Sequence, residues 1–398
     1  NNVDSLAELI GEAFDFPKPS FQNMEHLLQF LFKKTEQKPL ILVLDEYPYL
    51  RENSIGLDSV LQTVIDNHKD TSNIKLIICG SYVDTMKSLL EKQNPLYGRI
   101  DLTINLKPMD YYDSALFYPD FSCADKVRIF SVFGGIPYYN RLVDTKKSVR
   151  ENIIDLIASP GARLENEVSM YLNSEISKIT NANEVFEALA KGFSKYKDLL
   201  DQSNVSSGPA LVDILDKLMR MEVVIKEAPI NDENNRKKSG YFISDNLSLF
   251  YYKYIFRNIS RMNIMDPDVF YDKYIVNDFE TQHVPKIFEQ VCKQYLIRQN
   301  RAGQMTEIFE KIGKYYYDDP VHKKNGEFDI VTQDDNGYIF YEAKFRKDPV
   351  TESMVQNEIY QVRQTGLECY KYGFFSKSGF LCAPKEDQVF IELCTLYQ

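Results

Sequence analysis

Two carboxylates and a lysine lie on neighbouring apolar runs near the C-terminal end of the sequence. The run 338–345 carries Glu342 and Lys344 two residues apart, and Asp329 lies in the run before it. Side chains two residues apart in a strand project from one face, so Glu342 and Lys344 would share a face. Two carboxylates can hold Mg²⁺ or Mn²⁺ and leave water positions open, while a lysine orients or deprotonates the hydrolytic water. This set predicts metal-dependent phosphodiester cleavage.

A hairpin is expected to bring these residues together, because the sequence Asp-Asp-Asn-Gly between the two runs is a strong turn signal. A turn at residues 336–337 pairs Asp329 with Lys344, whereas a turn at residues 335–336 pairs Asp329 with Glu342. Both registers leave the two carboxylates and the lysine on one face.

A third carboxylate, Glu289, lies on the helix predicted to begin near His283, where apolar residues recur at helical spacing. The alternative for Glu342 and Lys344 is an exposed strand face with a local ion pair, since a Glu-x-Lys triplet alone is common. Asp329 on the partner run and Glu289 on the preceding helix weigh against that alternative.

Two further acids, Asp45 and Glu46, directly follow the apolar run 40–44, and Ser81 follows the next such run. Runs without alternation suit strands buried on both faces of a parallel sheet, and a third strand could lie at 102–106. In nucleotide hydrolases an aspartate at a strand end binds the Mg²⁺ water shell and a glutamate polarises the attacking water. The alternative is that acids follow a strand simply because the chain leaves the core there.

Arg99 lies in a loop-like stretch, and a mobile guanidinium there could reach the developing charge on a γ-phosphate as an arginine finger. The alternative is an ordinary loop arginine, which the sequence alone favours.

Four stretches in order resemble the archaeal-type P-loop ATPases of the AAA/STAND group: LVLDEYPYL at 42–50, IICGSYVDTM at 77–86, LYGRI at 96–100 and GGIPYY at 134–139. The resemblance spans most of residues 1–145. It implies that this part is a P-loop ATPase core with a parallel sheet, in which Asp45, Glu46, Ser81 and Arg99 serve ATP and Mg²⁺.

The phosphate-binding loop of that family is missing, because no Gly-x-x-x-x-Gly-Lys-[Ser/Thr] occurs in the 398 residues. In the family this loop lies N-terminal to the point where the sequence begins. Either the sequence has lost it by truncation, or the ATPase fold is a relic. The retention of Asp45, Glu46 and Ser81 favours truncation. We expect no ATP hydrolysis by the chain as printed.

Residues 283–398 resemble the PD-(D/E)xK nuclease superfamily, and more closely the C-terminal domain attached to the same archaeal-type ATPases. The helix glutamate of the family corresponds to Glu289, its aspartate to Asp329, and its E-x-K to Glu342 and Lys344. The resemblance implies a restriction-endonuclease-like α/β domain in which these residues form the catalytic and metal-binding set. Gln356 and Gln361 lie where family members often carry supporting polar residues, although an exposed helix face explains them equally well.

Between these parts, three short helices and two β runs give the order of a winged helix. Such a domain could direct Arg236, Lys237 and Lys238, at the polar tip between the β runs, toward DNA phosphates. The helix over 209–221 carries acids as well as bases, which is poor for phosphate approach. Interdomain packing is the equal alternative.

The composition gives no sign of a dedicated nucleic-acid binder, since the net charge is −11. No apolar run approaches the length of a membrane span, and we expect a soluble, cytoplasmic protein that does not meet a membrane. The six cysteines form no CxxC pair, which argues against a zinc module and against a dense disulfide framework.

We therefore predict an α/β multidomain chain. Residues 1–145 are a partial P-loop ATPase core, 146–262 a helical and winged-helix domain, 263–282 an acidic linker or docking segment, and 283–398 the nuclease-like domain. The favoured function is ATP-regulated action on DNA, with assembly of several copies as an open alternative. A regulatory or signalling ATPase with a nuclease-like binding platform for nucleic acid or a protein is the second hypothesis. A defence or mobile-element protein is the third.

Overall fold

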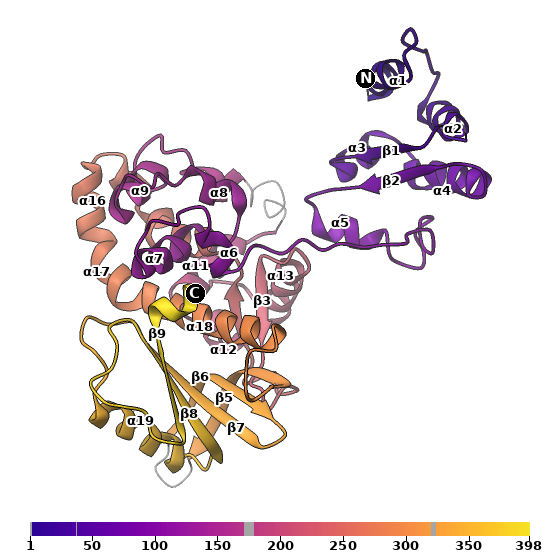
Figure 1. Cartoon of the computed structure of the whole chain (residues 1–398). Helices are drawn as coiled ribbons and strands as arrows, with labels where there is room; N and C mark the ends of the chain where they lie inside the picture. The colour runs from indigo at the N-terminus through magenta and orange to yellow at the C-terminus, as the bar shows by residue number, and fades with distance from the viewer. Residues whose placement is uncertain (1, 37, 171–178, 320–323) are drawn as a thin grey trace. The chain divides into compact units, whose positions relative to one another are not determined.

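The structure of the protein is a computed structural model that describes residues 2–36, 38–170, 179–319 and 324–398 (Figure 1). The chain divides into two compact units. The first comprises Asn1–Leu106 with Arg220–Glu222, and the second comprises Lys107–Met219 with Val223–Gln398. The first unit thus ends well before residue 145, where the sequence predicted the end of its first domain.

The first unit contains a parallel pair of strands. β1 (Leu40–Leu44) pairs with β2 (Ile74–Ile78), in a register that sets Leu44 opposite Ile78. A helix precedes each of the two strands, so this part of the chain has the order αβαβ. The helices are α1 (Asn2–Phe14), α2 (Met24–Lys34), α3 (Tyr47–Asn53), α4 (Leu57–His68) and α5 (Val83–Ser88).

This parallel pair is covered on one face only. Leu42 and Leu44 are buried in one cluster with residues of α2 and α4, whereas Ile41 and Val43 are 62% and 51% exposed. The prediction that both faces are buried is therefore wrong for the described residues, because the helices of this unit pack against a single face.

The apolar run 102–106 is not a third strand. Its backbone is irregular, and Leu102, Ile104 and Leu106 are 73%, 69% and 88% exposed. An alternating run becomes a strand only where a neighbouring backbone takes its hydrogen bonds. Among the described strands, β1 and β2 pair only with each other.

The second unit begins with α6 (Tyr111–Ala115) and α7 (Cys123–Phe133), which bind the C-terminal end of the chain. The Tyr111 hydroxyl donates to the Leu396 carbonyl at 2.7 Å, and Cys123 forms a disulfide with Cys394. These contacts explain why the unit boundary precedes α6. The sequence could not predict the disulfide, because 271 residues separate its cysteines.

Three helices between residues 182 and 220 are followed by an antiparallel hairpin, in the order that the sequence predicted. Their assignment as a winged helix stays a prediction. Ser148 begins α9 with a capping box, in which its hydroxyl accepts from the Glu151 amide and the Glu151 carboxylate accepts from the Ser148 amide. The elements of this part are α8 (Pro137–Leu142), α9 (Val149–Leu156), α11 (Ala182–Ala190), α12 (Tyr196–Gln202), α13 (Gly208–Arg220), β3 (Val224–Glu227) and β4 (Gly240–Ile243).

The acidic segment 263–282 is helical and packed within the second unit, and its role as a linker or a docking segment stays a prediction. Its aromatic residues Phe270 and Phe279 are fully buried. Its acids bind arginines of the preceding helices, as when Glu280 accepts from the Arg128 guanidinium at 2.8 Å. The segment contains α16 (Pro267–Tyr274), α17 (Val276–Asp278) and most of the π-helix Phe279–His283. The elements directly before it are α14 (Asn246–Phe250), the π-helix Tyr251–Ile255, the 3-10 turn Phe256–Asn258 and α15 (Ile259–Met262).

The chain ends in a mixed sheet of the order β5-β6-β7-β8-β9, in which β5, β6 and β7 are antiparallel and β7, β8 and β9 parallel (Figure 1). The order along the chain is a helix, three strands, a second helix and two further strands. The elements are α18 (Val284–Arg301), β5 (Lys311–Asp319), β6 (Lys324–Asp334), β7 (Gly337–Lys344), α19 (Glu352–Gln364), β8 (Cys369–Ser376), β9 (Gln388–Glu392) and the 3-10 turn Leu393–Tyr397.

Helices cover both faces of this sheet. Phe340 of β7 is buried in one cluster with Val355 and Ile359 of α19. On the other face, Phe288 of α18 packs on Phe345 with ring centroids 5.2 Å apart. Alternate residues of β7 therefore meet different helices, as the alternation predicted. No helix in the described ranges is long and apolar enough to cross a membrane.

Candidate functional site

The register of the β6–β7 hairpin decides which residue faces Asp329. Asp334 pairs with Gly337 and Ile330 with Tyr341, so the turn lies at residues 335–336. The pairing that the structure records ends at Ile330 and Tyr341, so a pairing of Asp329 with Glu342 stays a prediction. Of the two turns that the sequence allowed, the one at residues 335–336 is observed.

Lys344 lies between two carboxylates. Its ammonium donates to Glu342 Oε1 at 2.6 Å and to Glu358 Oε1, on α19, at 2.7 Å. All three side chains are about three-quarters buried, so the pairs are shielded more than a surface ion pair would be. Glu358 explains why Lys344 projects toward α19.

Asp329 is held by two lysines, both through the same oxygen. Lys286 of α18 donates to Asp329 Oδ1 at 2.9 Å, and Lys314 of β5 lies 3.3 Å from the same atom. Lys286 also donates to Glu289 Oε2 at 2.6 Å, so it links the helix glutamate to the strand aspartate. The structure thus brings Glu289 and Asp329 together through a shared ammonium group.

A β-bulge places Lys314 beside Asp329. The pairing of β5 with β6 shifts between Gly313 and Tyr315, so that two residues of β6, Asp329 and Ile330, lie opposite the single residue Lys314. Bulges redirect side chains, and they are over-represented next to active sites. Lys314 also donates to Glu327 at 2.7 Å, and this glutamate accepts from Lys195, at the start of α12, at 3.1 Å.

The contacts above form an alternating chain of charges that leads from the middle helices to α18. Such a chain fixes each carboxylate between ammonium groups, and removing one member leaves a partly buried charge uncompensated. Its members in order are Lys195, Glu327, Lys314, Asp329, Lys286 and Glu289.

The carboxylates have unequal acidities. Burial raises the pKa of Glu342 to about 7, and the charges of Glu358 and Glu289 add to the rise against the effect of Lys344. Burial likewise raises the pKa of Glu289, although Lys286 opposes the rise. Burial also opposes the ionisation of Asp329, but Lys286 and Lys314 outweigh it and lower the pKa. A cation near Glu342 would favour its charged form.

Metal binding by these residues stays a prediction, and it would rest on two protein carboxylates. Among the described residues, no three His, Cys, Asp or Glu side chains come close enough to share an ion. Mg²⁺, however, is usually bound by one or two carboxylates and keeps several waters. Within the described ranges, Asp329 Oδ2 and Glu342 Oε2 have no protein partner, because the lysines contact the other oxygen of each group.

Sequence reasoning missed the residues that hold these carboxylates in place. Lys286 and Glu289 are three residues apart on a helix, a spacing that could have been recognised as an ion pair. Lys195, Lys314 and Glu358 carry no sequence signal, since each reaches the site only through the folded sheet.

The N-terminal residues Glu46 and Ser81 also meet. The Ser81 hydroxyl lies 3.3 Å from Glu46 Oε2, and both side chains are exposed, as is Asp45. Glu46 has φ 49°, in the left-handed region, at the start of α3. Gly80 is required here, because a Cβ would lie 2.4 Å from the Pro48 ring. The ends of β1 and β2 therefore bring Glu46 and Ser81 together at one edge of the sheet.

Arg99 is engaged within the first unit. Its guanidinium donates to both oxygens of Asp66, on α4, at 2.8 and 2.6 Å, and to the carbonyls of Pro95 and Tyr97. These hydrogen bonds make Arg99 an ordered loop arginine in this structure. Its role as an arginine finger stays a prediction.

The tip of the β3–β4 hairpin packs on the edge strand β5. The amide of Asn231 donates to the Tyr316 carbonyl at 2.7 Å and its oxygen accepts from the Tyr316 amide at 3.0 Å. Lys238 pairs with Asp232 at 2.8 Å and lies over the Tyr316 ring. This supports the packing alternative for Lys238, whereas Arg236 and Lys237 are exposed. Nucleic-acid contact by the three residues stays a prediction.

Comparison with known proteins gives a family match to part of the C-terminal half of the chain. Residues 251–359 match DUF234, described as archaea bacterial proteins of unknown function. The matched range contains Glu289, Asp329, Glu342, Lys344 and Glu358. An uncharacterized protein of Methanocaldococcus jannaschii is 27% identical over 339 residues, which are 84% of this chain and 74% of that protein.

Two solved structures are also similar in part. A Walker-type ATPase of Pyrococcus abyssi is 17% identical, with a TM-score of 0.44 over 62% of this chain and 74% of that chain. A McrB AAA+ hexamer assembly with bound McrC, from Thermococcus gammatolerans, is 11% identical, with a TM-score of 0.25 over 81% of this chain and 75% of that chain.

Proposed function

We propose that the C-terminal sheet domain is a metal-dependent phosphodiesterase that cleaves nucleic acid, DNA first among the candidates. The observation that carries the proposal is the turn at residues 335–336, after which Asp329 and Glu342 come next to the last recorded pair of β6 and β7, Ile330 with Tyr341, while Lys344 donates to Glu342. Two carboxylates with free oxygens and a neighbouring ammonium are what hydrolysis of a phosphodiester requires.

In this proposal the residues have separate roles. Asp329 and Glu342 hold Mg²⁺ or Mn²⁺ through their unpartnered oxygens, and Glu289 supports the same ion through water. The ion, when bound, makes a coordinated water more acidic and offsets phosphate charge. Lys344 holds the hydrolytic water and the scissile phosphate, and Glu358 keeps the Lys344 ammonium in place.

In this proposal, ATP bound to the first unit regulates the cleavage of nucleic acid. Asp45, Glu46 and Ser81 lie at the ends of the parallel strands, and the contact between Ser81 and Glu46 supports a shared role. Exposed groups at a strand edge are open to a nucleotide phosphate or to the water shell of its Mg²⁺. ATP binding that depends on Glu46 and Ser81, measured by calorimetry, would support this part separately.

A second candidate function is a nuclease-like platform that binds nucleic acid or a protein partner without turnover. The observation that favours it is that each carboxylate of the site already has a lysine partner. Ammonium groups can neutralise such a site without a metal, and they also attract phosphates. The two candidates differ in whether the ion binds and the strand is cut.

The deciding experiment incubates the purified chain with plasmid, single-stranded DNA and RNA in Mg²⁺ or Mn²⁺. The test variants are Asp329→Asn, Glu342→Gln and Lys344→Met, and the matched control is Asp335→Asn, an exposed acid in the turn of the same hairpin. We expect cleavage by the parent and the control, with a loss of at least about a hundredfold in the test variants. Equal activity in all five proteins would exclude this site as the source of cleavage.

A binding measurement distinguishes the non-catalytic platform from the phosphodiesterase. Nucleic-acid binding without cleavage, unchanged by Mg²⁺ and weakened in Lys344→Met, would favour the platform. Calorimetric titration of the parent with Mn²⁺ provides an independent readout, since the phosphodiesterase proposal requires a site that Asp329→Asn abolishes.

A further inference from the structure

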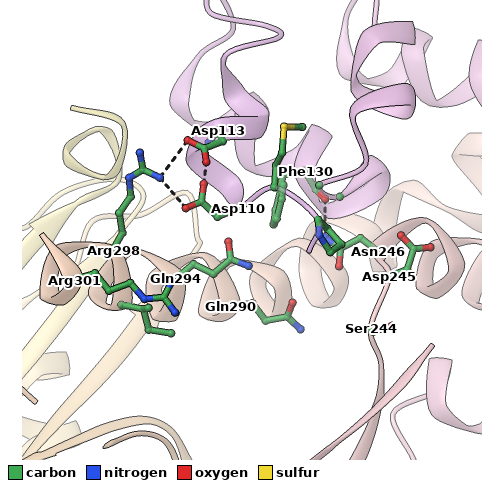
Figure 2. A pocket seen from close by; sticks show the side chains of 15 residues that line it. Asp110, Asp113, Phe130, Ser244, Asp245, Asn246, Gln290, Gln294, Arg298 and Arg301 are labelled. Carbon is green, nitrogen blue, oxygen red and sulfur yellow. Dashed lines mark hydrogen bonds and ion pairs between the residues drawn. The ribbon is translucent and has the colours of Figure 1, made fainter. Parts of the chain in front are cut away.

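A cavity of about 570 Å³ lies within the second unit, apart from the sheet site (Figure 2). One wall is α18, where Gln290, Gln294, Arg298 and Arg301 recur at helical spacing along one side. The other walls are the turn before α6, the Gly134-Gly135 loop after α7, and the turn into α14. The volume is in the range of about 300–1,000 Å³ that is typical of small-molecule sites.

The backbone around this cavity is tightly fixed. The Met109 amide donates to the Gly135 carbonyl at 2.9 Å, and a Cβ on Gly135 would lie 2.0 Å from the Met109 carbonyl oxygen. The Asn246 amide donates to the Phe130 carbonyl at 2.8 Å, which ties the turn before α14 to the end of α7. The GGIPYY stretch that the sequence singled out therefore forms a wall of the cavity.

The acids of the cavity already have partners. Asp110 accepts from two amides at the start of α6 and from the Arg298 guanidinium at 2.9 Å, and Asp113 accepts from the same guanidinium at 3.2 Å (Figure 2). Asp245 accepts from the Ser248 amide at the start of α14. These carboxylates stabilise the walls and leave few acceptors for a ligand.

The groups without partners include several donors. In the described part of the chain, the side chains of Arg301 and Gln290 make no hydrogen bond or ion pair, and the amide nitrogen of Gln294 has no acceptor, since only its oxygen is used, by the Tyr111 amide at 2.9 Å. Met109, Phe130 and Ile297 also line the cavity and are apolar. A ligand that fits must supply acceptors and negative charge, and it must have an apolar part as well.

We infer that this cavity binds a nucleoside phosphate, with the phosphate on Arg301 and the base toward Met109 and Phe130. A guanidinium and two amides offer the fork-like donors that phosphate oxygens accept. The ligand is either a free nucleotide or the phosphorylated end of a nucleic-acid strand, which present the same chemistry. The inference goes beyond the proposed cleavage and does not depend on it.

The test measures binding to the whole chain by calorimetry with three probes: AMP, a short single strand with a 5′-phosphate, and the same strand with a 5′-hydroxyl. The variants are Arg301→Ala and Gln290→Leu. The matched control is Arg141→Ala, another exposed arginine in the last turn of a helix of the same unit. Thermal unfolding of each variant verifies that it is folded.

We expect Arg301→Ala to weaken binding of the phosphorylated probes by about tenfold or more, and Arg141→Ala to leave it within about twofold. Gln290→Leu should weaken it less. Binding of AMP identifies a free nucleotide as the source, and binding of the phosphorylated strand alone identifies a strand end.

Three results would overturn the inference. One is the absence of binding of both phosphorylated probes at millimolar concentration. Another is equal binding by the parent and Arg301→Ala. The third is AMP binding that is lost in Glu46→Gln and kept in Arg301→Ala, which would assign the nucleotide to the first unit.

Discussion

Two groups of acids lie in or directly after strands of this chain, in opposite surroundings. Asp45 and Glu46 are exposed at the end of a parallel pair covered on one face, whereas Asp329 and Glu342 lie in a five-stranded sheet covered by helices on both faces. Burial gives the second group its lysine partners and perturbed pKa values. The coverage of the sheet, more than the residue types, decides how completely a site is positioned by its own chain.

The largest expected difference between the two sheets is in packing energy. Phe340 is 1% exposed, and Phe340→Ala should lower the free energy of unfolding of the second unit by about 3–5 kcal/mol through loss of contact and a cavity. Val43, 51% exposed, is its counterpart in the first unit, and Val43→Thr should change stability by less than about 0.5 kcal/mol.

Denaturant unfolding with hydrogen exchange of peptides from each sheet checks both values, because a chain with two units need not unfold in one transition. Comparable losses in the two variants would contradict the view that the outer face of the first sheet is uncovered.

The next effect is in pH dependence. The pKa of Glu342 is raised to about 7 from 4.5, so the folded chain holds this proton more tightly than the unfolded chain does. The free energy of unfolding must then fall as pH rises from about 4.5 to 7, and Glu342→Gln should remove that slope and gain about 2–3 kcal/mol at pH 8. Lys344 keeps Glu358 as its partner in this variant.

Unfolding curves at half-unit steps between pH 4.5 and 8 measure this slope. Glu46→Gln is the matched control, and it should shift stability by less than about 0.5 kcal/mol at every pH. The prediction would be wrong if the stability of the parent rose across this window and Glu342→Gln showed the same pH dependence. That result would mean that Glu342 is ionised in the folded chain and that its charge is balanced by Lys344.

Local pattern predicted much of this structure. Alternation and the Asp-Asp-Asn-Gly turn gave the β6–β7 hairpin, the common face of Glu342 and Lys344, and two registers of which one is observed. Those features depend on neighbouring residues, whose effects a sequence displays directly.

Features that depend on distant residues were not predictable in the same way. Lys314 reaches Asp329 through a bulge, Lys195 arrives from another part of the unit, and Glu358 from α19. The exposed face of β1 was missed for the same reason, since an apolar run does not reveal whether anything covers it. The sequence predicts which groups could react, and tertiary packing decides which of them are paired.

The smallest expected effect concerns Arg99 and Asp66, the ion pair of the first unit. Both groups are open to solvent, and pairs of this kind contribute little to stability. In a double-mutant cycle with Arg99→Ala and Asp66→Asn, measured by denaturant unfolding, the effects of the two substitutions should therefore nearly add. Additive effects mean that the guanidinium can leave Asp66 for a phosphate at little cost, as an arginine finger requires. A double variant that loses much less stability than the sum of the two single losses would make the pair a structural anchor and remove Arg99 from the nucleotide site.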